Sequence, residues 1–190
     1  FIGDCTRAWE KAAILSRDVH IVYKDKPYKT ILGIAPRMYD DLWTAGKVMY
    51  KLEPILADGG TLIIYAPHIT EISYTHGKIL DKIGYHTRDY FLKRMDKFAG
   101  IPRAAMAHST HVKGIGTYID GVEKPRANVV LATGIGKKRC RKVNLDYMNP
   151  DDINVADYEN KEDQGVLVVQ HAGEVLHRLS SGYIPTIPKA

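Results

Sequence analysis

The sequence predicts an α/β fold in which a mostly parallel sheet is flanked by helices, a Rossmann-like three-layer arrangement in a single domain. Short apolar segments alternate along the chain with segments of helical periodicity, which is typical of parallel sheets with crossover helices. One of them, 61–66, is an almost continuous apolar run, as expected of a strand covered on both faces. With 190 residues and 45% hydrophobic content, the chain is large enough for one substantial core.

The elements before this central strand follow from periodicity and from turn residues. Apolar residues recur at helical spacing in 6–17, and a strand-like segment follows at 19–23. Residues 30–34 form a second apolar run that ends at an Ala-Pro pair, which predicts a buried strand. Asp40 or Asp41 can cap the helix that we expect to run to about residue 52.

The elements after the central strand are predicted in the same way. Helical periodicity indicates helices at 70–83 and 87–98, and short apolar runs indicate strands at 104–107 and 127–133. The remaining elements are expected to be a helix at 151–159, a strand at 165–170 and a helix at 173–179. We place the domain at 1–182 and a Pro-containing, extended tail at 183–190.

The composition indicates where in the cell the protein is expected and which partners it can have. The only two cysteines, Cys5 and Cys140, cannot form a disulfide framework, so we expect a cytoplasmic protein. No apolar run approaches the roughly 20 residues that cross a bilayer, so no membrane partner is expected. The net charge of +5 includes a basic run at 137–142, which could contact nucleic acid but is more often a solvated face. The chain begins with Phe1 rather than Met, and we expect it to be part of a longer protein.

Ligands of open parallel sheets bind outside the carboxyl ends of the strands, which selects a small set of loops. Histidines concentrate there, since His68, His108, His111 and His171 all fall into these predicted loops. The selected loops are 35–40, 67–70, 108–116, 134–137 and 171–174.

Two short patterns could carry chemistry. Thr44 and Lys47 share one face of the predicted helix after the first loop, where a lysine can bind a substrate carboxylate and a threonine can donate a hydrogen bond. An ordinary solvated lysine is the alternative. His108 and His111 form an H-x-x-H pair that could chelate zinc, but no acidic or cysteine ligand lies nearby in sequence, so we predict no metal site. No complete phosphate-binding loop occurs, and both Gly-Ile-Gly segments are interpreted as turns.

In the segment 31–66, the expected strand 31–34 is followed by Ala35-Pro36, by Asp40, by the helical stretch 43–47 and by the apolar strand 61–66. This order resembles the C-terminal domain of the nickel-dependent lactate racemases. That family shows a strand, a Gly- and Pro-containing loop with Asp, and an aromatic-Gln-x-x-Lys motif on the next helix. It continues with a Gly-Gly-bounded apolar strand. Here the motif reads Trp43-Thr44-Ala45-Gly46-Lys47, and the strand follows Gly59-Gly60. The entry at Gly3-Asp4 and the loop His171-Ala172-Gly173-Glu174 are also similar, although the similarity is patchy after His68.

The resemblance implies a 2-hydroxy acid racemase or epimerase that uses a nickel pincer nucleotide to accept and return a hydride at C2. In that family the cofactor is held mainly by an N-terminal domain, which we expect to be the partner of this chain and to lie outside this sequence. Alone, the chain is therefore expected to bind no cofactor and to be inactive. Two alternatives remain: a cofactor-free binding module of the same superfamily, and a basic nucleic-acid-binding domain.

The resemblance also implies roles for particular residues. Lys47 matches the family lysine that contacts the substrate or cofactor region, whereas Thr44 replaces the glutamine that assists it. Because a short hydroxyl replaces a longer amide, the substrate is expected to be a 2-hydroxy acid other than lactate. The predicted catalytic residues are therefore Lys47 and Thr44. The predicted substrate-binding residues are Tyr39, Trp43, His68, His108, His111 and Lys113.

Overall fold

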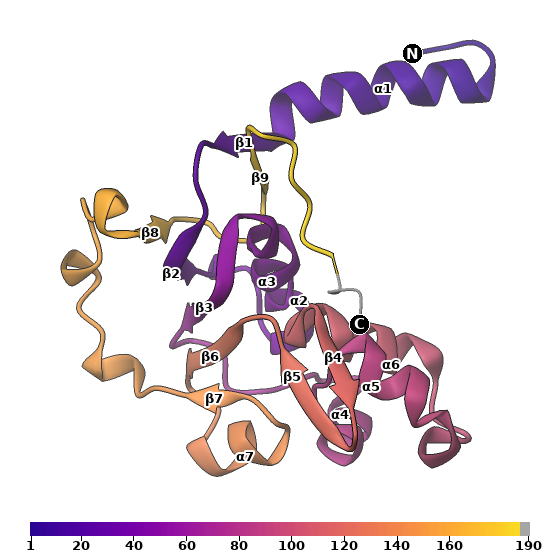
Figure 1. Cartoon of the computed structure of the whole chain (residues 1–190), viewed down its shortest axis with the longest axis vertical. Coiled ribbons are helices and arrows are strands. Elements are labelled where there is room, and N and C mark those ends of the chain that lie inside the picture. The colour runs from indigo at the N-terminus through magenta and orange to yellow at the C-terminus, as the bar shows by residue number, and fades with distance from the viewer. Residues whose placement is uncertain (187–190) are drawn as a thin grey trace.

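The computed structural model describes residues 1–186 and confirms the predicted α/β class. Its centre is a five-stranded, fully parallel sheet in the order β7-β6-β3-β2-β8 (Figure 1). In the middle of the sheet, Ile31 lies opposite both Leu62 and Leu167. The strands are β2 (Tyr28–Ile34), β3 (Leu56–Ala66), β6 (Asn128–Thr133), β7 (Asp146–Tyr147) and β8 (Val166–Val169).

Helices cover one face of the sheet and build the main core. Alternate strand residues, such as Ile31, Leu62 and Leu131, are buried against them, because successive side chains of a strand point to opposite faces. The helices are α2 (Leu42–Ala45), α3 (Lys47–Leu52), α4 (Gly77–Ile83), α5 (Arg88–Lys93), α6 (Arg103–Lys113) and α7 (Lys137–Lys142), with the 3₁₀ helices η1 (Glu53–Ile55) and η2 (Met95–Phe98).

The opposite face of the sheet carries a smaller core. Leu32, Ile63 and Ala132 point to this side and pack with Ile153. The third layer is therefore thin, and it is made by a segment that contains the 3₁₀ helices η3 (Pro150–Asp152), η4 (Val155–Asp157) and η5 (Glu162–Gln164).

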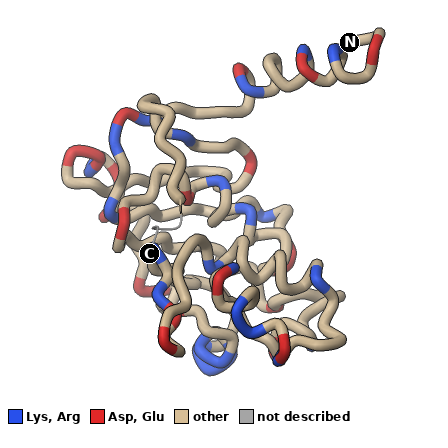
Figure 2. The backbone as a smooth tube through the Cα atoms, turned by 45° about the vertical axis from the view of Figure 1, so that its right-hand side comes forward, with Lys and Arg blue, Asp and Glu red and all other residues tan. Residues whose placement is uncertain are grey.

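The remaining elements lie outside the main sheet. The long helix α1 (Cys5–His20) leads into β1 (Ile21–Lys24), which pairs in parallel with β9 (Leu176–Leu179). A hairpin of β4 (Gly116–Ile119) and β5 (Val122–Pro125) follows α6. In Figures 1 and 2, α1 projects away from the rest of the molecule.

Three predicted elements are wrong in type. Residues 104–107, predicted as a strand, belong to α6, where alanines and Met106 are good helix formers and Ala105, Met106, Ser109 and Val112 make its buried face. Residues 173–179, predicted as a helix, contain β9, because pairing with the distant β1 overrides local preference. Residues 151–159 form η3 and η4 instead of one helix; Asn149 caps η3, and such side-chain bonds compete with a helix.

Several predicted helices differ in extent. The helix predicted at 87–98 is divided into α5 and the 3₁₀ helix η2. The helix predicted at 40–52 is divided at Gly46 into α2 and α3, with Asp41 as the cap of α2. The helix predicted at 70–83 begins only at Gly77. The tail shows no helix or strand over 183–186, and its residues 187–190 lie outside the described residues. Within residues 1–186, no helix is both long and apolar enough to cross a membrane.

Candidate substrate-binding groove

An open cavity of about 500 Å³ lies along α3 and α6, next to the start of α2. The two helices approach closely at Gly46. A Cβ atom there would lie 2.8 Å from Cγ2 of Val112 and 3.2 Å from Cε1 of His108, so only glycine fits without displacing α6. The cavity is lined by Trp43, Thr44, Lys47, Tyr50, Ala104, Ala107, His108 and His111.

The aspartate that caps α2 positions the first of these residues. Asp41 is buried, and its Oδ1 accepts a hydrogen bond of 3.0 Å from the backbone N–H of Thr44. Its Oδ2 accepts a second bond, of 3.3 Å, from the N–H of Tyr74. Because a capping side chain fixes the start of a helix, Asp41 orients Trp43 and Thr44 at the edge of the cavity.

A stack of aromatic rings forms one wall. The Trp43 ring lies 4.0 Å from the ring of His108, nearly parallel to it, and 4.5 Å from the ring of His76. Burial, reinforced by the nearby His111, lowers the pKa of His108 to about 4. His108 is therefore a neutral ring at physiological pH and supplies a hydrogen-bonding group rather than a charge.

Lys47 supplies the cation of this cavity. Its Nζ lies 5.2 Å from the centre of the Tyr39 ring, within the range of a cation–π contact. The loop after β8 packs against both residues, since a Cβ atom on Gly173 would lie 3.1 Å from Cβ of Lys47 and 3.1 Å from Cε2 of Tyr39. Over residues 1–186, no carboxylate lies within salt-bridge distance of Lys47, so its charge is available to an anionic ligand.

The structure brings five of the eight predicted site residues to the cavity wall: Trp43, Thr44, Lys47, His108 and His111. Two others lie behind it, since Tyr39 is buried beside Lys47 and Nε2 of His68 lies 3.1 Å from the carbonyl oxygen of Tyr39. Lys113 lies elsewhere: its ammonium donates a 2.6 Å hydrogen bond to the Asn144 carbonyl, and burial lowers its pKa. It ties α6 to the segment after α7.

Sequence reasoning missed Tyr50, which also lines the cavity and lies 5.6 Å, ring to ring, from His111. The sequence spacing could have indicated it, because Tyr50 follows Lys47 by three residues and lies on the same face of the helix. It was overlooked because the region 108–111 was expected to be a loop, whereas it belongs to the helix that faces α3.

The histidine pair does not complete a metal site. His108 stacks on Trp43, and His111 lies next to Tyr50. No group of three or more His, Cys, Asp or Glu side chains suited to a metal ion occurs in residues 1–186. The side chains of residues 1–186 therefore do not by themselves supply the ligand set that a nickel ion would need.

The basic run forms α7, the blue coil at the bottom of Figure 2. Arg139 of this helix forms salt bridges with two carboxylates, Glu71 at 2.6 Å and Asp81 at 2.9 Å. These salt bridges connect α7 to α4 and to the loop after β3. Burial raises the pKa of Cys140 to about 11, which keeps this thiol protonated and unreactive.

Comparisons with solved structures place this fold among known proteins. A crystallised protein from Thermotoga maritima matches 92% of this chain with 36% sequence identity and a TM-score of 0.85. The fold is also similar to that of a lactate racemase. The apoprotein of that enzyme from Thermoanaerobacterium thermosaccharolyticum matches 90% of this chain with 14% identity and a TM-score of 0.60.

This chain spans only part of both proteins, 42% of the Thermotoga chain and 40% of the lactate racemase chain. No protein-family profile matches the chain, and no curated protein sequence matches it. What the comparisons show is therefore a lactate racemase-like α/β fold.

Proposed function

We propose that this chain is the C-terminal, substrate-binding domain of a 2-hydroxy acid racemase or epimerase. The observation that carries the proposal is the position of Lys47. In a fold similar to that of a lactate racemase apoprotein, Lys47 is a cation without a salt-bridge partner among residues 1–186. It lies beside Tyr39 and Gly173, which belong to the loops that follow the carboxyl ends of β2 and β8. Ligands of parallel α/β folds bind outside these ends.

The residues around Lys47 can hold a small hydroxy acid in one orientation. Lys47 attracts the carboxylate as a point charge, and the Thr44 hydroxyl, also in the cavity wall, can hydrogen-bond to the substrate. The stacked rings of Trp43 and His108 form a flat, uncharged wall against which a carbon chain can pack. In this proposal the nickel pincer nucleotide supplies the hydride chemistry from outside the chain, whose own residues bind and orient the substrate.

The proposal includes a partner domain that holds the cofactor. Helix α1 supports it, because its sixteen residues include none that is buried. Isolated helices of this length are marginal in water, so α1 needs a partner surface. Its apolar face carries Trp9, Leu15 and Val19, which are 69%, 54% and 62% exposed. Since the two similar chains are more than twice as long as the part that matches here, we assign this face to the remaining domain of such a protein.

The direct test uses the complete protein with its cofactor bound, in deuterated water. A panel of 2-hydroxy acids that includes sugar acids is incubated with it, and configuration at C2 is followed by chiral chromatography. Inversion of one acid, with loss of inversion in Lys47→Ala, is the expected result. No inversion in a nickel-loaded protein would point to an acid outside the panel. No inversion and no nickel would overturn the proposal in favour of a cofactor-free binding module.

A further inference from the structure

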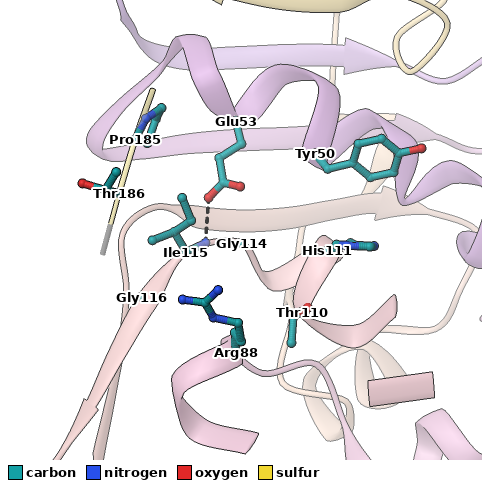
Figure 3. A pocket seen from close by; sticks show the side chains of 10 residues that line it. All are labelled: Tyr50, Glu53, Arg88, Thr110, His111, Gly114, Ile115, Gly116, Pro185 and Thr186. Atoms are coloured by element: carbon teal, nitrogen blue, oxygen red, sulfur yellow. Dashed lines mark hydrogen bonds between the residues drawn. The ribbon is translucent and has the colours of Figure 1, made fainter. Parts of the chain in front are cut away.

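The groove does not end at the cavity that contains Lys47. A second cavity of about 450 Å³ is lined by Tyr50 and His111, among other residues (Figure 3). The same two side chains also line the first cavity. The two cavities are therefore neighbours along α3 and α6, and together they are called the groove. Lys47 lies at its proximal end, and the second cavity is its distal end.

Two opposite charges face each other at the distal end. Glu53 follows α3 and Arg88 begins α5, and Figure 3 shows both side chains directed into the same space from opposite sides. Oε1 of Glu53 accepts a 2.7 Å hydrogen bond from the N–H of Ile115, which fixes the carboxylate in place. Burial raises the pKa of Glu53. In residues 1–186, Arg88 has no carboxylate within salt-bridge distance, so its donors are available to a ligand.

This pair is chemically suited to hydroxyl groups. A hydroxyl can donate to the Glu53 carboxylate and accept from the Arg88 guanidinium at the same time, because it is both donor and acceptor. A second carboxylate on the ligand would meet Arg88 but would be repelled by Glu53. The Thr110 side chain lines the same cavity and adds another hydroxyl partner.

The length of the groove excludes the smallest substrates from using both ends. Lys47 and Glu53 are six residues apart along α3 and its continuation, which corresponds to about 9 Å of helix rise. A three-carbon acid bound at Lys47 is too short to touch Glu53 or Arg88. An extended six-carbon acid, counted to its terminal oxygens, is comparable in length to this rise, so it can extend past Tyr50 and His111 towards the distal end.

We propose that the distal cavity is a hydroxyl-binding subsite, with Glu53 and Arg88 as specificity-determining residues for a polyhydroxylated 2-hydroxy acid of the sugar-acid class. This inference rests on the proposed function, because it takes Lys47 as the anchor of the substrate carboxylate. It adds the substrate class and the residues that select it.

The experiment compares kcat/KM for gluconate, a six-carbon sugar acid, with kcat/KM for lactate in the complete protein with its cofactor. The wild type is expected to prefer gluconate at least tenfold. Arg88→Gln and Glu53→Gln should each lower the gluconate-to-lactate ratio at least tenfold; the second variant keeps the acceptor for Ile115. Arg141→Gln, on the exposed side of α7, is the matched control and should leave the ratio unchanged.

The outcomes separate the two proposals. Turnover of lactate with a ratio that neither variant changes would overturn the subsite and leave the proposed function standing. If neither acid is turned over, the proposed function is not supported, and NMR titration of the 190-residue chain with gluconate decides the subsite. Binding that Arg88→Gln weakens at least fivefold would support the subsite, and absence of binding would overturn it.

Discussion

At the scale of single residues, the charge of Lys47 is the feature on which the proposed function depends most. In the proposed function, replacing Lys47 with Ala removes a charge-assisted contact with the substrate carboxylate, and such contacts contribute roughly 1.5–3 kcal/mol. We expect kcat/KM for the 2-hydroxy acid to fall about 10- to 100-fold, as measured by initial rates of inversion in the complete protein. Lys82→Ala, at an exposed position on α4, is the control and should change nothing. Unchanged turnover in Lys47→Ala would show that the carboxylate binds elsewhere.

The neutral ring of His108 gives a second residue-scale prediction, on stability against pH. Its pKa falls from 6.5 to about 4 in the folded protein, mainly through burial and then through His111, with Asp41 opposing and His76 adding to the shift. The unfolded chain takes up this proton below about pH 6.5, whereas the folded protein does so only near pH 4. The contribution of His108 to the unfolding free energy is therefore fully present above pH 6.5. It decreases by roughly 3 kcal/mol as the pH falls towards 4.

Urea unfolding of wild type and His108→Gln at pH 7.5, 6.0 and 5.0 isolates this effect. Groups that are not coupled to His108 contribute equally to both proteins. The difference in unfolding free energy therefore reports His108 together with the groups coupled to it, which are His111, Asp41 and His76. We expect the wild-type advantage to shrink steadily from pH 7.5 to 5.0. A difference that stays constant with pH would contradict the assignment of a neutral, buried ring.

At the scale of elements, the close contact of α3 with α6 shapes the groove, and Gly46 permits it. Gly46→Ala gains about 1 kcal/mol of helix propensity, because its backbone is already helical. However, the new methyl group would lie 2.8 Å from Cγ2 of Val112, a branched side chain buried in the core. Overpacking of this kind costs about 1–3 kcal/mol, so we expect net destabilisation and weaker substrate binding. Gly136→Ala, where a Cβ atom would meet nothing within 4 Å, should be nearly neutral.

Thermal or urea unfolding of the two alanine variants measures this difference. Equal stability of Gly46→Ala and Gly136→Ala would mean that α6 yields to the methyl group without cost, and the groove would then not depend on this contact.

The sequence correctly predicts the elements whose secondary structure is determined by their own residues. The strands at 30–34 and 61–66 read as buried because apolar side chains occupy both of their faces. The predicted helix 173–179 failed because β9 exists only through its pairing with β1, more than 150 residues away in the chain. The local sequence pattern does not indicate such a distant pairing partner. The run 104–107 is too short for its hydrophobic periodicity to distinguish a strand from a helix.

At the scale of the whole molecule, the groove joins segments that are distant in sequence. Lys47 and His108 were selected separately, one through a motif and one through a loop rule that used the wrong secondary structure. Their meeting follows from the packing of α3 against α6, which no spacing in the sequence encodes. Glu53 and Arg88 were missed for the same reason, because each is an ordinary charged residue until the fold directs both into one cavity.

The exposed face of α1 leads to the last prediction, which concerns how the molecule is assembled. Trp9→Glu with Leu15→Glu places charges on the face that we assign to the partner domain. In the 190-residue chain, unfolding free energy should change by less than about 0.5 kcal/mol, because neither side chain is buried there. In the complete protein, burying two unpaired charges should cost several kcal/mol and separate the domains. The oligomeric state of the 190-residue chain is measured by sedimentation. A dimer that these substitutions dissociate would contradict the assignment to a partner domain and show that α1 pairs with a second copy.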